Sequence, residues 1–247
     1  MITSMAVKER LFGYLRLRDP VFFISELADR FGVKTVLDVG CGPHSRLRVL
    51  RPKLFTIGLD AFAPTLDEAR RNSTHDVFVL ADIAVDDLAV RVRGAGYESV
   101  DLVVLLDVIE HFTRQSGFRM LESCESLASK YVLVKTPNGF QPQGPEFGNP
   151  FDRHLSGWFP HDFESLGYSV YGADGMRSMM GYLGSMRYRY PGASLINLTL
   201  AKLFDISSRP RLAFSLIAIK SMAGHPAILG EGLKDPNRLP HHLRYLP

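Results

Sequence analysis

The sequence has few cysteines, little net charge and no long apolar run. Its 247 residues include two cysteines, Cys41 and Cys124, and one tryptophan. The two cysteines fall in a predicted turn and a predicted helix, so we expect neither a disulfide framework nor a metal site. Such low cysteine use is typical of a reducing compartment and predicts a cytoplasmic protein.

The small charge imbalance and the lack of a spanning segment exclude further classes. The formal net charge is +3, from 29 basic and 26 acidic residues, which does not indicate a nucleic-acid partner. No stretch reaches the roughly 18 uncharged apolar residues that a membrane helix needs. Lys8, Glu9 and Arg10 precede any long apolar run, so we expect no signal peptide. Without a linker-like run or repeat, the chain is predicted to form one domain over 1–247.

Strand and helix patterns alternate along the first two thirds of the chain. Two amphipathic helices are expected within 1–33, over Met5–Leu17 and Pro20–Phe31. The predicted strands are Thr35–Gly40, Leu54–Asp60, Val77–Leu80, Val100–Leu106, Tyr131–Thr136, Tyr168–Ala173 and Arg211–Lys220. Helices are predicted between them at Ser45–Arg51, Pro64–Arg71, Val85–Val92, Thr113–Ser129 and His161–Leu166. This alternation indicates βαβ units and a parallel sheet covered on both faces.

Two irregular segments interrupt the second half. A loop over 138–160, rich in glycine, proline and asparagine, is long enough to predict a functional role. An insertion over 174–210 is expected to act as a lid of mixed methionine and arginine, typical of a cover over an amphiphilic or anionic substrate. Its helix could lie on a membrane surface through 193–206. Packing on the sheet, or on a second subunit in a homodimer, is the favoured alternative.

A glycine turn follows the first strand. Val36, Leu37 and Val39 are typical of a buried parallel strand. Gly40 and Gly42 then allow a sharp turn that brings backbone amides close to a ligand.

Acidic residues recur at the ends of successive strands. They are Asp38, Asp60, Asp82, Asp107 and Glu110. The carboxyl ends of parallel strands meet in one crevice, so these carboxylates indicate a cationic or hydroxyl-rich ligand. A pyrophosphate would be repelled, which disfavours a nicotinamide dehydrogenase. Taken singly, Asp60 could instead cap the next helix and Asp82 could serve a turn.

The order of these motifs resembles that of the class I S-adenosylmethionine-dependent methyltransferases, most closely the small-molecule branch that includes quinone-biosynthesis enzymes. The residues that carry the resemblance are Leu37-Asp38-Val39-Gly40-Cys41-Gly42, Gly58-Leu59-Asp60, Ala81-Asp82-Ile83 and Asp107-Val108-Ile109-Glu110-His111-Phe112. It implies a doubly wound Rossmann-like α/β fold with about seven mostly parallel strands, the last one antiparallel. It also implies that S-adenosylmethionine is the cofactor and that a small molecule receives the methyl group.

The resemblance further implies a role for each cofactor-binding residue. Gly40, Cys41 and Gly42 would admit the methionine part, with Asp38 organising its ammonium group. Asp60 would accept both ribose hydroxyls, and Ala61 and Phe62 would flank the adenine. Asp82 would accept from the adenine amino group beside Ile83, and Asp107 would line the side nearest the sulfonium. The family's third glycine is absent, since His44 and Ser45 follow Pro43.

Catalytic and substrate-binding residues are expected after the fourth and fifth strands. His111 is the first candidate for a general base, because an unperturbed imidazole titrates near neutrality. It could equally be a structural histidine bonded to Glu110 or to a carbonyl. Glu110 and His154 are further candidates for catalytic residues. Asn138, Trp158 and Arg187 are expected to contact substrate, although Trp158 could instead anchor the loop.

Two other functions remain open from the sequence. One is an S-adenosylmethionine-binding scaffold or regulator without catalysis. The other is a nucleic-acid or protein methyltransferase, disfavoured because no long basic stripe is present.

Overall fold

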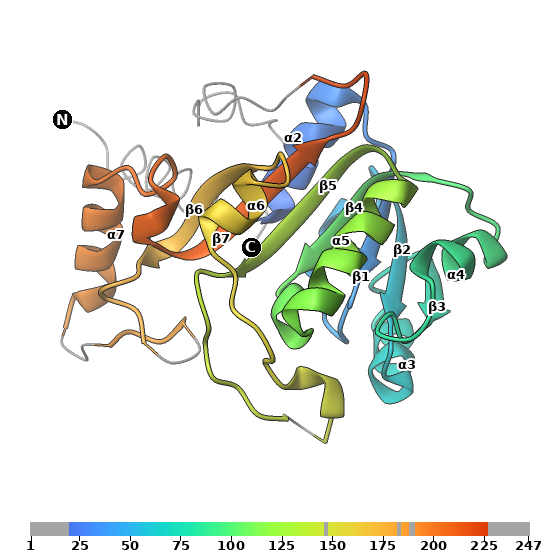
Figure 1. The fold of residues 1–247 in the computed structure, drawn as a ribbon, viewed down its shortest axis with the longest axis horizontal. Helices are drawn as coiled ribbons and strands as arrows, with labels where there is room; N and C mark the ends of the chain where they lie inside the picture. The colour runs from blue at the N-terminus through green and yellow to red at the C-terminus, as the bar shows by residue number, and fades with distance from the viewer. Residues whose placement is uncertain (1–19, 146–147, 182–183, 188–190, 227–247) are drawn as a thin grey trace.

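A single seven-stranded sheet organises the computed structural model, which describes residues 20–145, 148–181, 184–187 and 191–226. Its strands follow the order β3-β2-β1-β4-β5-β7-β6 (Figure 1). Their bounds are Thr35–Val39 (β1), Phe55–Asp60 (β2), Val77–Leu80 (β3), Val100–Leu106 (β4), Ala128–Pro137 (β5), Ser169–Met176 (β6) and Ala213–Ser221 (β7).

The strand directions confirm the predicted sheet. Neighbouring strands from β3 to β5 pair in parallel. The last strand, β7, is inserted between β5 and β6 and runs antiparallel to both. From β1 the chain builds the sheet toward one edge, and from β4 it builds toward the other edge. A crevice therefore opens between β1 and β4 at their carboxyl ends.

Helices cover both faces of the sheet (Figure 1). The α-helices are Pro20–Phe31 (α2), Ala63–Arg71 (α3), Leu88–Gly94 (α4), Arg114–Leu127 (α5), Pro160–Glu164 (α6) and Ala193–Leu203 (α7). Short 3-10 helices lie at Arg46–Leu50 (η1), Ile109–His111 (η2), Pro150–Asp152 (η3) and Pro210–Leu212 (η5). One buried cluster joins α2 and η1 to the sheet, and a second joins α4, α5 and α6 to its other face. The fold is therefore the doubly wound α/β architecture that was predicted.

The bounds differ from the sequence-based ones at several elements. The helix expected over Ser45–Arg51 is the 3-10 helix η1, started by Ser45, whose hydroxyl accepts the Leu47 N–H. β6 continues through Met176, so the insertion before β7 begins later than 174. Helix α2 matches its predicted bounds, whereas Met5–Leu17 lies outside the described residues.

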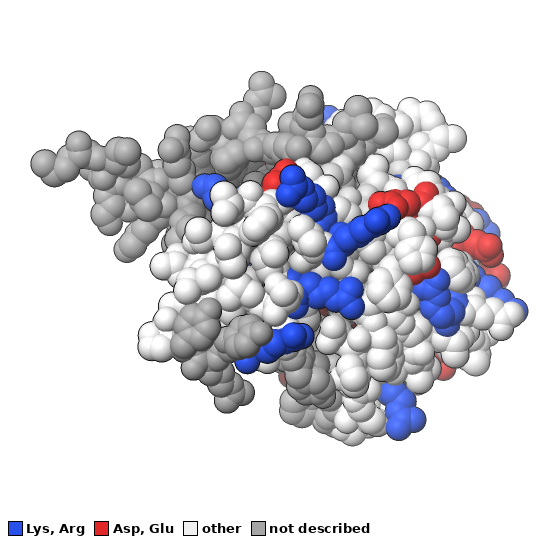
Figure 2. Space-filling model, turned by 60° about the vertical axis from the view of Figure 1, so that its left-hand side comes forward, with Lys and Arg blue, Asp and Glu red and all other residues white. Residues whose placement is uncertain are grey.

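Helix α7 packs on the edge of the sheet through the face that carries its smaller side chains. Ala193, Asn197 and Ala201 are buried, and α7 contacts β6. Leu195 and Leu203 of the same helix are 58% and 74% exposed. Lys and Arg outnumber acidic side chains on the face that comes forward with α7 (Figure 2). No helix among the described residues is long and apolar enough to cross a membrane. Membrane contact through 193–206 and a homodimer stay predictions.

Candidate functional site

The glycine turn after β1 forms the floor of the crevice. Gly40 and Gly42 have φ angles of +70° and +62°, in the left-handed region that favours glycine. The N–H groups of Gly40 and Cys41 both donate to the Leu59 carbonyl, which ties the turn to β2. A Cβ on Gly40 would lie 2.7 Å from Cγ2 of Val108. The turn and the β4 end are thus packed directly together.

Asp38 is held beneath this turn by two side chains. It is 2% exposed, and its Oδ2 accepts from the Ser45 hydroxyl at 2.7 Å and lies 3.1 Å from Nε2 of His75. Ser45 thus binds Asp38 and also starts η1. Asp38 therefore has a structural role, holding the turn in place. Its predicted contact with the cofactor's ammonium group stays a prediction.

Asp60 at the end of β2 is oriented by backbone donors. Its Oδ2 accepts from the Gly42 N–H at 3.1 Å and its Oδ1 from the Phe62 N–H at 2.9 Å. Burial raises its pKa, and these two donors oppose that shift. Each carboxylate oxygen has a second lone pair left, so Asp60 can accept one further bond at each oxygen. Two adjacent hydroxyl groups of a ribose match this pattern.

The carboxyl ends of β1, β2, β3 and β4 line one cavity of about 1180 Å³. It gathers every residue predicted to bind the cofactor: Asp38, Gly40, Cys41, Gly42, Asp60, Ala61, Phe62, Asp82, Ile83 and Asp107. The loop after β5 reaches over it, since Phe151, Arg153 and Leu155 also line its wall. We name this space the donor cavity. Asp82 also serves a local turn, accepting the Ala84 N–H.

A second cavity of about 960 Å³ adjoins the first. We name it the acceptor cavity. Five residues belong to the walls of both cavities: Pro20, Arg46, Asp107, His111 and Lys135. The remaining wall comes chiefly from the loop after β5, from α7 and from β7. The two cavities therefore meet at these residues.

An ion pair stands at this shared rim. Nζ of Lys135 donates to Asp107 at 2.7 Å and lies 3.4 Å from Asp174. Asp107 has a φ of +57°, which is rare for a residue with a side chain and places local strain at the site. Burial acts to lower the pKa of Lys135, but the two carboxylates outweigh it and raise that pKa. Lys135 is thus a fixed cation between the two cavities.

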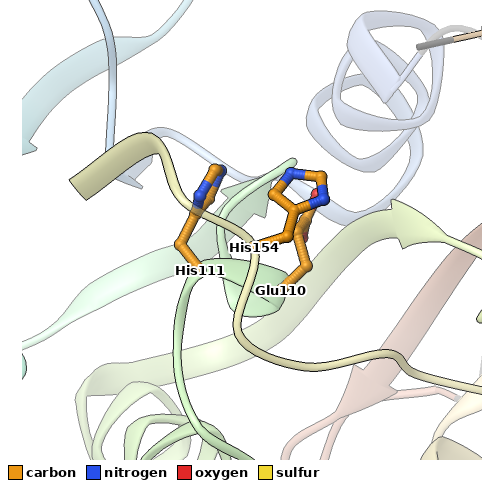
Figure 3. Close-up of side chains that lie close together, drawn as sticks. All are labelled: Glu110, His111 and His154. Atoms are coloured by element: carbon orange, nitrogen blue, oxygen red, sulfur yellow. The ribbon is translucent and has the colours of Figure 1, made fainter. Parts of the chain in front are cut away.

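Glu110, His111 and His154 form a compact cluster in the acceptor cavity wall (Figure 3). The ring centroids of the two histidines are 4.7 Å apart. Glu110 is 2% exposed and accepts from the Thr136 hydroxyl at 2.9 Å. Burial, aided by the charge of Asp107, raises the pKa of Glu110 to about 8. Burial lowers the pKa of His111, which keeps its ring neutral at physiological pH.

The structure does not bring the three predicted substrate residues to either cavity wall. Trp158 is fully buried, packs on Phe118 and Phe163, and donates to Ser156, so it anchors the loop. Asn138 is 1% exposed and donates to the carbonyls of Pro210 and Ala213.

Arg187 is exposed and belongs to neither wall. Its backbone N–H donates to Met179. The predicted contact of these three residues with substrate stays a prediction.

Two residues of the site were missed from the sequence. His75 lies over Gly58, where a Cβ would come within 2.7 Å of its Nδ1. A glycine inside a strand is a signal of such close approach. Lys135 is a charged residue near the end of a mostly apolar strand. Such a charge indicates a side chain that extends beyond the core at the end of the strand.

Comparison with known families decides the class of the protein. A family model described as a methyltransferase domain matches residues 9–184, more than half of the chain. The chain belongs to the S-adenosylmethionine-dependent methyltransferases. No curated protein matches the sequence significantly. The quinone-biosynthesis resemblance stays a prediction.

Solved structures share the fold of this methyltransferase at low sequence identity. The plantazolicin methyltransferase BpumL with bound SAH has a TM-score of 0.52 and 15% identity, over 89% of this chain and 90% of that one. A methyltransferase from Clostridium acetobutylicum has a TM-score of 0.53 and 11% identity, over 85% and 92%. One from Archaeoglobus fulgidus has a TM-score of 0.50 and 17% identity, over 81% and 94%.

The donor cavity of the methyltransferase fits S-adenosylmethionine. A Cβ on Gly42 would meet nothing within 4 Å, so the turn leaves open space above the backbone. Asp60 offers one free lone pair on each oxygen for the two ribose hydroxyls. Asp107 lines both cavities, and its predicted position nearest the sulfonium stays a prediction.

Proposed function

We propose that this methyltransferase transfers a methyl group to a hydroxyl oxygen of a small amphiphilic molecule bound in the acceptor cavity. The observation that carries this proposal is the shared rim of Asp107, His111 and Lys135 between the two cavities. Methyl transfer is an in-line displacement, so donor and acceptor must meet across one short boundary. A small molecule seated in the acceptor cavity meets that requirement.

The walls of the acceptor cavity favour an amphiphilic ligand. Met180, Leu198 and Phe214 supply apolar surface, while Gln141 and Ser215 supply polar groups. Its volume of about 960 Å³ lies in the range of cavities that hold drug-sized ligands. The Lys and Arg side chains on the face of the molecule shown in Figure 2 would attract an anionic substituent.

The three side chains Glu110, His111 and His154 support an oxygen acceptor. In the displacement, the C–O bond forms as the C–S bond of the sulfonium breaks and its electron pair returns to sulfur. The hydroxyl proton must leave as well, which requires a base or an electrophile beside the acceptor. His111 is neutral and faces both cavities, so this cluster can receive the hydroxyl group at the point of transfer.

The experiment is a transfer assay with methyl-labelled S-adenosylmethionine and a panel of hydroxylated small molecules. Leu198→Trp should fill the acceptor cavity and raise the KM for the acceptor at least tenfold, with cofactor affinity unchanged. Leu203→Trp, on the same helix but 74% exposed, is the matched control and should behave as wild type. Labelling of RNA or protein but of no small molecule would contradict the proposal, as would a Leu198→Trp enzyme whose KM for the acceptor equals that of wild type.

A further inference from the structure

The cluster of Glu110, His111 and His154 has the composition of a metal site. One ligand atom from each residue lies within 4.8 Å of the other two (Figure 3). Two imidazoles with one carboxylate are a donor set for divalent first-row transition metals, whereas Mg²⁺ and Ca²⁺ prefer oxygen ligands throughout. Metal–ligand bonds of roughly 2.0–2.2 Å require only a modest contraction of the cluster.

Both histidines are held in the form that binds a metal. Nδ1 of His111 lies 3.3 Å from the Arg153 carbonyl, and Nδ1 of His154 lies 2.7 Å from the Gln141 carbonyl. A carbonyl oxygen only accepts, so each Nδ1 carries the proton and each Nε2 carries the lone pair. Backbone carbonyls behind the ring are the usual outer partners of metal-binding histidines, since they fix tautomer and orientation.

Glu110 is supported in the same way. The Thr136 hydroxyl donates to its Oε2, and the backbone N–H groups of Leu155 and Ser156 donate to its carbonyl. These last two bonds tie the segment next to His154 directly to η2, which carries Glu110 and His111. The three side chains therefore come from two segments that are fastened to each other.

We propose that Glu110, His111 and His154 bind one divalent transition-metal ion, and that this ion holds the acceptor hydroxyl oxygen. Three protein ligands leave coordination positions open, as in catalytic rather than structural sites. All three residues line the acceptor cavity and His111 also reaches the donor cavity, so the open positions face the point of transfer.

The ion gives the cluster its chemical role. A bound cation lowers the pKa of the hydroxyl, so the proton leaves to solvent near neutral pH. The oxygen then forms the new C–O bond while the C–S bond breaks. His111 acts as a ligand rather than as a base. The acceptor role of the ion rests on the proposed function, whereas its binding does not.

Metal binding is tested on the full-length protein after treatment with a chelator, using Co²⁺ in calorimetry and visible absorption. We expect one Co²⁺ per chain with micromolar affinity and an absorption spectrum that reports nitrogen and oxygen ligands. His154→Ala and the isosteric Glu110→Gln should each weaken Co²⁺ binding at least tenfold. His161→Ala, which removes an exposed histidine near the same loop, should leave binding unchanged.

Binding of S-adenosylhomocysteine, measured on each variant, verifies that the donor cavity is folded. Millimolar Co²⁺ affinity, or equal affinity in wild type, His154→Ala and Glu110→Gln, would overturn the metal site. Full transfer to a hydroxyl acceptor after chelation would overturn the role of the ion while leaving the proposed function intact. Conversely, tight Co²⁺ binding in an enzyme that methylates no hydroxyl compound would support the site and reject the proposed acceptor.

Discussion

Replacing Gly40 by alanine tests the packing between the glycine turn and β4. The left-handed backbone costs an alanine about 1–2 kcal/mol. The new Cβ would lie 2.7 Å from Cγ2 of Val108, a β-branched side chain that is 7% exposed and has little room to rotate. Overpacking of this kind costs about 1–3 kcal/mol. The two effects together predict a loss of about 2–5 kcal/mol in the free energy of unfolding.

Gly42→Ala is the matched control for the backbone effect. Gly42 has a similar φ of +62°, but its Cβ would have no neighbour within 4 Å. It should therefore lose only about 1–2 kcal/mol. Urea unfolding followed by the emission of the single tryptophan, Trp158, measures both losses. Equal losses at Gly40 and Gly42 would refute the packing argument.

A double-mutant cycle sharpens this test. Val108→Ala removes the two methyl groups that a Cβ on Gly40 would strike, so Gly40→Ala should cost less in that background. We expect a coupling free energy of at least about 1 kcal/mol, with the double variant more stable than the sum of the two single losses predicts. Strict additivity of the two changes would show that the turn moves away from β4 instead.

Three further outcomes are expected. Asp60→Ala should weaken S-adenosylmethionine binding about ten- to a hundredfold in calorimetry, because hydrogen bonds to a charged group contribute about 1.5–3 kcal/mol; unchanged affinity would reject the ribose contact. Burial alone would raise the pKa of Asp162, but its bonds to Arg114 hold that pKa below its usual value. The stabilisation is present above the unfolded pKa of about 3.9 and is lost as pH falls through the folded one. The destabilisation by Arg114→Met should therefore be clear at pH 7 and shrink in unfolding experiments below about pH 4; a constant difference would contradict the pairing. Burial raises the pKa of the Cys41 and Cys124 thiols, so a disulfide reagent should label neither in the native protein and both in urea; fast native labelling would contradict this.

The cofactor half of the protein was predictable because its signals are local. Buried parallel strands are apolar throughout, and the acidic residue that ends each one is read directly from the sequence. Asp60 and Asp82 could be assigned to one crevice because parallel strands end at the same edge. The donor cavity contains both of them.

The acceptor half was less predictable because its contacts join distant segments. His154 meets His111 only after the loop beyond β5 folds back, which no spacing in the sequence shows. The sequence left open whether Trp158 contacts substrate or anchors the loop, because it does not show that Gly117 on α5 leaves the space in which the Trp158 ring is buried. The low cysteine count likewise said nothing about a site built from histidine and glutamate.

The site consists of two cavities, and this affects how the specificity for the methyl acceptor can change. The donor cavity depends on the ends of β1 to β4, whereas Met180, Leu198 and Phe214 of the acceptor cavity follow β5 in the chain. Segments beyond the loop after β5, which itself lines the donor cavity, could therefore be exchanged between related enzymes without rebuilding the cofactor-binding part. In a chimera of that kind, Asp107 at the end of β4 would lie at the boundary between the retained donor cavity and the new acceptor cavity.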